Sequence, residues 1–174
     1  RWSDPARRLT LDEENKYYDG STPIKPQRLM HELPRLFPYA TRYIAEAGNS
    51  ATWAIHYLHP FDRRVMGNRP SSGGTFRACM EFATMGWAIG AAVGTGLGSR
   101  GTPVVCITGD GSLLMSGQEL TVAVSEKLPI IFVVLNDAAL GMVKHGQRLA
   151  NAEPIGYELP PVDFCALAKA MGAD

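Results

Sequence analysis

Cys-Ile-Thr-Gly-Asp-Gly-Ser at residues 106–112 and Pro-Ile-Ile-Phe-Val-Val-Leu-Asn-Asp-Ala-Ala-Leu-Gly-Met at residues 129–142 flank a helix-like segment. Residues 103–108 and 129–135 are short, continuous apolar runs rich in Val and Ile, without alternation. Such runs are typical of parallel strands that are covered by helices on both faces. Each run leads into a loop that contains an Asp.

The segment between the two runs predicts a helix. Ser116-Gly117-Gln118-Glu119 has the Ser-x-x-Glu form of a capping box, so we expect a helix from near Gly117 to about Lys127, stopped by Pro129. Strand, helix and strand in this order predict an α/β fold with three layers, in which helices cover both faces of a parallel sheet.

The two acidic loops, at residues 109–112 and 136–139, are expected to open on one side of this sheet. In open parallel sheets, ligands bind beyond the carboxyl ends of the strands. Glycines let backbone amides approach a phosphate closely, whereas a carboxylate among them repels a phosphate unless a divalent cation lies between. The pattern therefore indicates a metal ion together with a diphosphate.

Gly109-Asp110-Gly111, followed at the end of the next strand by Asn136-Asp137, resembles the thiamin diphosphate motif, which usually ends in Asn-Asn. The resemblance implies that Asp110, Asp137 and the backbone carbonyl of Ala139 hold Mg²⁺, which in turn holds the diphosphate of the cofactor. Asp137 departs from the usual Asn, but Asp is also a hard oxygen ligand and suits Mg²⁺ or Ca²⁺.

The first half of the chain predicts a helix, a strand and a second helix. Apolar residues at helical spacing from Pro26 to Leu36 indicate the first helix, and residues 43–47 resemble a strand. Gly48-Asn49-Ser50 then forms a turn before a second helix that holds Trp53. Such a turn is either an anion site or a plain connection.

Loops and linkers are expected at two places in this half. Residues 1–20 are charged and polar with little periodicity, so they predict a linker from a preceding domain. Residues 60–78 are rich in Arg, Gly, Pro and Ser and predict a surface loop.

The apolar segment from Met80 to Gly98 raises the alternative of a membrane span. Glu81 and the many glycines favour a buried helix of a globular domain instead. Glycines at every fourth position form one smooth stripe on such a helix, against which another backbone is expected to pack closely. These glycines are Gly86, Gly90, Gly94 and Gly98.

Two further segments resemble acetohydroxyacid (acetolactate) synthases. Glu46-Ala47-Gly48-Asn49-Ser50 is similar to the acidic-x-Gly-x-x turn that binds the diphosphate end of the cofactor in that family. Ala83-Thr84-Met85-Gly86 is similar to their Gly-Thr-Met-Gly, which implies that Met85 props the cofactor in its bent, reactive conformation and that backbone near Ala83 binds the pyrimidine. From its residue type alone, Met85 is a core methionine.

Residues 138–147 resemble the family's Gln-Gly-Met-Val-x-Gln-Trp-Gln, with Gly146 at the position of the Trp. This implies a wider substrate pocket at Gly146, while a lone His such as His145 is more often a surface residue than a catalyst. The resemblance also assigns cofactor binding to residues of three loops. They are Gly48, Asn49, Ser50, Gly109, Asp110, Gly111, Ser112, Asp137, Gly141 and Met142.

Length and composition bound the remaining possibilities. The chain has 174 residues, 45% of them hydrophobic, which suits one domain. Lys and Arg total 17 and so do Asp and Glu, so neither nucleic acid nor an anionic membrane is indicated as a partner. Three widely spaced cysteines without a Cys-x-x-Cys motif argue against disulfides or a zinc site and predict a cytoplasmic setting.

The resemblance implies that residues 21–174 are the diphosphate-binding domain of a thiamin diphosphate-dependent decarboxylase or carboligase, a lyase or transferase acting on a small 2-oxo acid. A short helix is expected at 162–171, after which the family's last strand is missing, so the domain is truncated at its C-terminal end. The activating Glu of the family belongs to a pyrimidine-binding domain, usually contributed by another subunit. A homodimer or homotetramer is therefore expected.

Two other functions stay open at this stage. One is a binding module that retains thiamin diphosphate without turnover. The other is a phosphatase of the haloacid dehalogenase type, which carries Gly-Asp-Gly-x-Asn-Asp as one contiguous motif. Here a strand, a helix and a strand separate the two halves, and no Asp-x-Asp nucleophile motif occurs in the chain.

Overall fold

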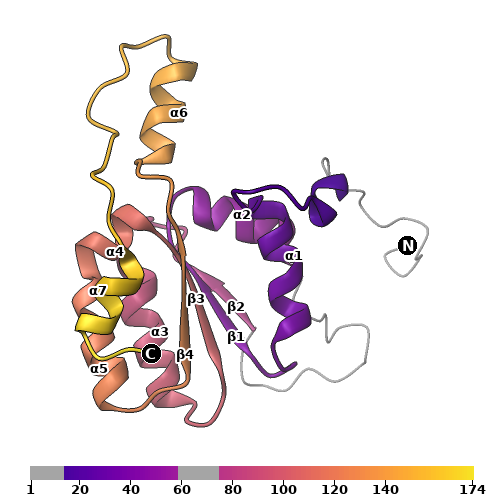
Figure 1. The fold of residues 1–174 in the computed structure, drawn as a ribbon, viewed down its shortest axis with the longest axis vertical. Helices are drawn as coiled ribbons and strands as arrows, with labels where there is room; N and C mark the ends of the chain where they lie inside the picture. The colour runs from indigo at the N-terminus through magenta and orange to yellow at the C-terminus, as the bar shows by residue number, and fades with distance from the viewer. Residues whose placement is uncertain (1–13, 59–74) are drawn as a thin grey trace.

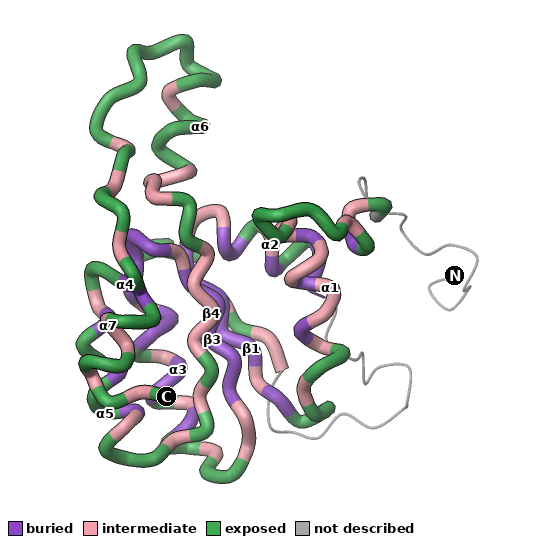
Figure 2. The backbone as a smooth tube through the Cα atoms, in the orientation of Figure 1, coloured by how far each residue is buried: buried purple, intermediate pink, exposed green. Residues whose placement is uncertain are grey.

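The computed structural model describes residues 14–58 and 75–174, which form an α/β fold around a parallel sheet. The strand order is β2-β1-β3-β4, and every pair of neighbours is parallel. β3 lies in the interior of the sheet and is the most buried strand (Figure 2). The strands are β1 (Arg42–Ala45), β2 (Phe76–Ala78), β3 (Val104–Gly109) and β4 (Ile130–Leu135).

Helices cover both faces of the sheet, as the apolar runs predict (Figure 1). One face carries the 3-10 helix η2 (Glu14–Tyr18), α1 (Pro26–Leu36) and α2 (Asn49–Tyr57). The other carries α3 (Trp87–Gly98), α4 (Asp110–Ser116), the 3-10 turn η4 (Gly117–Glu119), α5 (Leu120–Ser125) and α7 (Phe164–Ala170). The predicted three-layer architecture is confirmed.

The two central strands contribute to both cores. Tyr43 and Val105 belong to the cluster beneath α1 and α2, whereas Ile44 and Cys106 belong to the cluster beneath α3. Successive side chains of a strand point to opposite faces, so a strand that is covered on both sides needs apolar residues at every position. This explains why the runs in the sequence do not alternate.

The helix after β3 begins earlier than the capping box predicts. α4 starts at Asp110, directly at the strand end, and the 3-10 turn Gly117–Glu119 separates it from α5. The side chain of Ser116 caps no helix. The prediction of a start near Gly117 was wrong because the chain turns into a helix as soon as it leaves the sheet, and the Ser-x-x-Glu pattern falls on the break between two short helices.

The predicted loop at 60–78 ends in a strand. Phe76–Ala78 pairs with Tyr43–Ala45, and Phe76 and Ala78 pack on the core, so three residues at the end of this loop complete the sheet. The rest of the loop, up to residue 74, lies outside the described residues, as does the predicted linker up to residue 13. The ring of Tyr17, from the described end of that linker, is buried beside α1.

The glycine stripe does not receive a backbone from the described part of the chain. Gly90, Gly94 and Gly98 lie on the exposed side of α3, and a Cβ atom added to any of them would meet no described atom within 4 Å. The close approach is at Gly96 instead, whose Cα faces Ile130 and Leu128. Among the described residues, no helix has the length and apolar content needed to cross a bilayer.

α3 itself starts at Trp87, later than the apolar segment suggests. Gly86 precedes it with φ 91°, in the left-handed region that favours glycine, and this conformation ends the helix on its N-terminal side. An added Cβ at Gly86 would overlap the hydroxyl oxygen of Ser116. Gly86 is therefore needed both for its φ and for the approach of α4.

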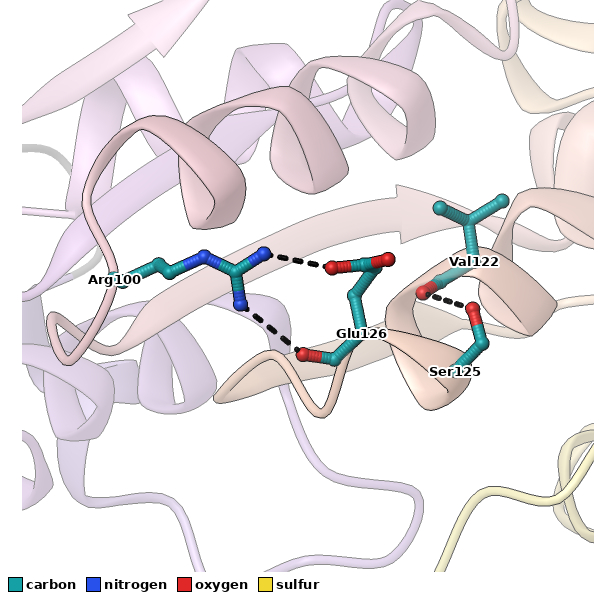
Figure 3. A network of polar contacts seen from close by, with 4 residues as sticks. All are labelled: Arg100, Val122, Ser125 and Glu126. Atoms are coloured by element: carbon teal, nitrogen blue, oxygen red, sulfur yellow. Dashed lines mark hydrogen bonds and ion pairs between the residues drawn. The ribbon is translucent and has the colours of Figure 1, made fainter.

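An exposed ion pair lies at the end of the sheet where β3 and β4 begin. The guanidinium of Arg100, after α3, donates to the carboxylate of Glu126 at 2.7 Å and to its carbonyl oxygen at 3.5 Å, beside the bond from Ser125 to the carbonyl of Val122 (Figure 3). Both charged side chains are substantially exposed, so water and salt screen the attraction and the pair adds at most about 1 kcal/mol.

α6 (Gly141–Leu149) stands apart from the layers and projects beyond the carboxyl edge of the sheet (Figures 1 and 2). It buries none of its residues. The side-chain amide of Gln147 bonds both backbone groups of Ile155, at 2.8 and 3.2 Å, and the ammonium of Lys144 lies 5.3 Å from the centre of the Tyr157 ring. Local contacts with the returning segment thus hold this arm.

Gly86, directly before α3, and Gly90, within that helix, should respond to the same substitution in opposite directions. Gly86→Ala forces an unfavourable φ and a clash with Ser116, so we expect it to lower the free energy of unfolding by about 1–3 kcal/mol. Gly90→Ala, exposed within the same helix, should raise it by about 0.5–1 kcal/mol. Urea unfolding of both variants measures this, and equal shifts would contradict the assignment of Gly86.

Candidate functional site

A cavity of about 360 Å³ lies at the carboxyl edge of the sheet, where the loops after β1, β3 and β4 meet. The sequence assigned site residues to these loops, and the structure brings most of them to this one cavity. Those that line it are Gly48, Asn49, Ser50, Met85, Gly109, Asp110, Gly111, Ser112, Asp137, Ala139, Gly141 and Met142.

Two predicted residues do not line the cavity. Ala83 is exposed, with φ 48°, two positions before Met85. Gly146 lies exposed within α6, and an added Cβ would meet no described atom within 4 Å. The role of Ala83 beside the pyrimidine and that of Gly146 in a substrate pocket stay predictions.

The turn after β1 forms the first wall. Gly48 precedes α2 with φ 88°, a conformation that favours glycine. The hydroxyl of Ser50 donates toward the carbonyls of Glu46 and Ala47, at 3.2 and 3.0 Å, which braces the turn. Asn49 and Ser50, the first residues of α2, line the cavity, and a helix N-terminus favours an anion.

The loop after β3 places a carboxylate at the cavity. Asp110 is only 4% exposed, and its Oδ1 accepts a hydrogen bond from the amide of Gly111 at 2.7 Å. Its Oδ2 is buried and accepts no hydrogen bond from any described residue. A buried carboxylate oxygen without a donor is costly unless a cation completes it, so this donor set fits a hard divalent ion.

The loop after β4 places further oxygen-bearing groups at the cavity. Asp137 and Ala139 line the same cavity. Two backbone bonds brace this loop, from Leu140 to the carbonyl of Tyr157 at 2.7 Å and from Leu159 to that of Ala138 at 2.9 Å, and neither uses the carbonyl of Ala139. The described residues contain no group of three His, Cys, Asp or Glu able to hold a metal, so a bound ion needs backbone and ligand oxygens as well.

Glycines keep the cavity loops close to one another. A Cβ at Gly111 would approach the end of the Met85 side chain to 3.2 Å and that of Leu140 to 2.7 Å. A Cβ at Gly141 would overlap the side-chain amide of Asn49. Met85, which is 39% exposed, thus reaches over the loop that carries Asp110.

Glu46, immediately after β1, is fully buried, with 0% exposure. Its Oε1 accepts from the amide of Ala47 at 2.9 Å, and its Oε2 accepts from the amide of Ala88 at 3.0 Å. Burial raises the pKa of this carboxyl above its ordinary 4.5, while bonds from the amides of Ala47, Ala88 and Gly86 oppose the shift. Burial raises the pKa of the Cys106 thiol, and the nearby negative charge of Glu46 raises it further.

Sequence reasoning missed one wall of the cavity. Pro23 and Ile24 line it from the segment before α1, Pro26 from the first position of α1, and Trp53 from α2. Trp53 lies one helical turn after Asn49, so the i, i+4 spacing from a predicted site residue could have identified it. No local signal marks the other three, because only the packing of α1 beside α2 brings them to the site.

The pKa of Glu46 predicts how stability depends on pH. Because the folded pKa lies above the ordinary 4.5, the fold favours the protonated acid, and this contribution is complete below 4.5 and is lost as pH rises through the folded pKa. The free energy of unfolding of the wild type, relative to Glu46→Gln, should therefore fall from acidic to neutral pH. Urea unfolding across this range measures it, with the exposed Glu119→Gln as control. A difference that grows with pH would contradict the shift.

The comparisons with known proteins agree with this geometry. Residues 46–174 match the family described as thiamine pyrophosphate enzyme, C-terminal TPP binding domain. The chain is 36% identical over 163 residues to the acetolactate synthase isozyme 3 large subunit of Escherichia coli, covering 90% of this chain and 26% of that protein.

Other relatives cover the same part of the chain. A putative acetolactate synthase large subunit, IlvB2, of Mycobacterium tuberculosis is 35% identical over 160 residues, which are 87% of this chain and 26% of that protein. The putative thiamine pyrophosphate-containing protein YdaP of Bacillus subtilis is 26% identical over 155 residues, 89% of this chain and 25% of that protein. The chain thus spans about a quarter of the length of these relatives, and it belongs to the thiamine pyrophosphate enzymes as their C-terminal TPP-binding domain.

Proposed function

We propose that residues 21–174 bind thiamin diphosphate and Mg²⁺ as one half of the active site of a 2-oxo acid decarboxylase or carboligase similar to acetolactate synthase. The observation that carries this proposal is the buried Oδ2 of Asp110, which accepts no hydrogen bond from the described chain, in a residue that lines the same cavity as Asp137 and Ala139. A cation between these oxygens and a diphosphate satisfies both.

Each wall of the cavity has a task in this proposal. The oxygens of Asp110, Asp137 and Ala139 hold the ion, and the amides of the turn at Gly48 and Asn49 bind the diphosphate. Met85 supports the rings of the cofactor from its position over the Asp110 loop. When bound, thiamin diphosphate supplies an electron sink for the loss of carbon dioxide from a 2-oxo acid.

The other half of the active site is proposed to come from a partner. In this proposal, a pyrimidine-binding domain of another subunit, in a homodimer or homotetramer, contributes the glutamate that activates the cofactor. The similarity to acetolactate synthase large subunits, of which this chain covers 26%, supports such a division. The substrate is a small 2-oxo acid, and a cytoplasmic location stays a prediction.

The metal assignment predicts the behaviour of Asp110→Ala. Loss of a carboxylate ligand should weaken Mg²⁺-dependent binding of thiamin diphosphate by more than about 100-fold, as measured by calorimetry. Without metal, the variant should unfold at a urea concentration no lower than the wild type, because it removes a buried oxygen that no donor satisfies. Glu119→Gln, at an exposed position outside the cavity, serves as control. Unchanged affinity in Asp110→Ala would refute the metal site.

The proposed division of the active site predicts the activity of the chain alone. Without the activating glutamate, consumption of pyruvate should be at least about 100-fold slower than in the presence of a pyrimidine-binding domain. A coupled assay before and after addition of that domain measures the difference. Full activity of the 174-residue chain by itself would show that no second domain is needed.

A further inference from the structure

Glu46 connects two parts of the site that are far apart in sequence. Its backbone amide donates to the carbonyl of Ile107 at 2.8 Å and so prolongs the pairing of β1 with β3. From this fixed point, the carboxylate binds the amide of Ala47 in the turn and the amide of Ala88 in the first turn of α3. The two bonded amides are 41 residues apart along the chain.

The amide bonded by Glu46 in α3 lies close to Met85. Met85 is followed by Gly86, Trp87 and Ala88, and the amide of Ala88 donates to the Glu46 carboxylate. Gly86 also lies close to the Ser116 side chain, which leaves no space for a Cβ at this position. Glu46 thus holds the backbone that follows Met85, and the tip of the Met85 side chain lies close to Gly111.

We propose that Glu46 is a positioning residue that fixes the spacing between the diphosphate-binding turn and Met85, so that both ends of one cofactor molecule fit the cavity together. This rests on the proposed function, since it assigns the turn to the diphosphate and Met85 to the rings. The carboxylate acts through Ala47 and Ala88 and lines no part of the cavity itself.

A carboxylate is the side chain that this position requires. Both of its oxygens accept from backbone amides, so one group bridges two segments. In Glu46→Gln, the side-chain NH₂ faces one of these donors, and that bond is lost. In Glu46→Asp, the chain is one methylene shorter, so the carboxylate can stay with Ala47 but no longer reaches Ala88.

A role limited to stabilising α3 predicts a different result from a role in spacing. If a substitution only lowers stability, the affinities of all ligands of the cavity fall by the same factor, or none of them falls. If a substitution changes the spacing, the affinity falls only for a ligand that occupies both ends of the cavity. Inorganic pyrophosphate with Mg²⁺ occupies the diphosphate end, whereas thiamin diphosphate with Mg²⁺ occupies both, so the ratio of their dissociation constants separates the two roles.

The experiment measures this ratio for the 174-residue chain by calorimetry. For Glu46→Gln and Glu46→Asp, we expect thiamin diphosphate to bind about tenfold more weakly, as for loss of one charge-assisted hydrogen bond, with pyrophosphate affinity close to that of the wild type. The control is Leu33→Ala, a buried position of α1 outside the cavity, which lowers stability without touching the bridge. It should leave the ratio unchanged.

The same measurement in a Met85→Ala variant tests whether Glu46 acts through Met85. In Met85→Ala, the further change Glu46→Gln should no longer alter the ratio, because the side chain that it positions is gone. Equal weakening of both ligands, or an effect of the same size in Met85→Ala, would overturn the inference while leaving the proposed function intact. If the wild type bound neither ligand, the proposed function would fail, and this inference with it.

Discussion

Parallel pairing of β1, β3 and β4 is the constraint on which the rest of the structure depends. Ala45 lies beside Ile107, and Gly109 lies beside Leu135, so the three strands end at one edge of the sheet. Each strand end releases a loop at that edge, and helices on both faces leave the loops no other direction. A site assembled from three loops distant in sequence therefore follows from the register of the strands alone.

The sequence predicted the parts of this arrangement that are encoded locally. The continuous apolar runs identified β3 and β4 because both faces of those strands are covered, and the glycines on either side of Asp110 and the Asn-Asp pair at Asp137 marked the loops that follow. Resemblance to a known family assigned the turn at Gly48, which the structure places in the same cavity. The local pattern indicated a metal ion and a diphosphate, whereas thiamin as the rest of the ligand was implied by the resemblance alone.

The remaining features depend on tertiary contacts that no local pattern contains. Ser116 and Glu119 satisfy the capping-box spacing but fall on a break between two short helices. Phe76 begins a strand at the end of a segment whose composition is typical of a loop. The contribution of Ile24 to the cavity arises from the packing of one helix beside another, and a single sequence carries no record of that packing.

Glu46 and Asp110 are both buried carboxyl groups at or near the site, but their hydrogen-bond partners differ. Glu46 receives backbone amides on both oxygens and so completes its own environment within the chain. Asp110 is satisfied on one oxygen only. Burial of a charge is tolerated when donors or cations surround it, so the first group has a structural solution and the second depends on a ligand.

The projecting α6 has a consequence for the local stability of the molecule. Because it buries no residue, its opening exposes no core, and the free energy of that opening is set by a few hydrogen bonds near Gln147 and Leu140. Segments of this kind exchange their amide hydrogens long before the sheet does. Met142, on α6, belongs to the cavity wall, whereas Asp110 belongs to the sheet edge. One wall of the cavity thus belongs to a segment of lower local stability than the sheet edge that carries Asp110.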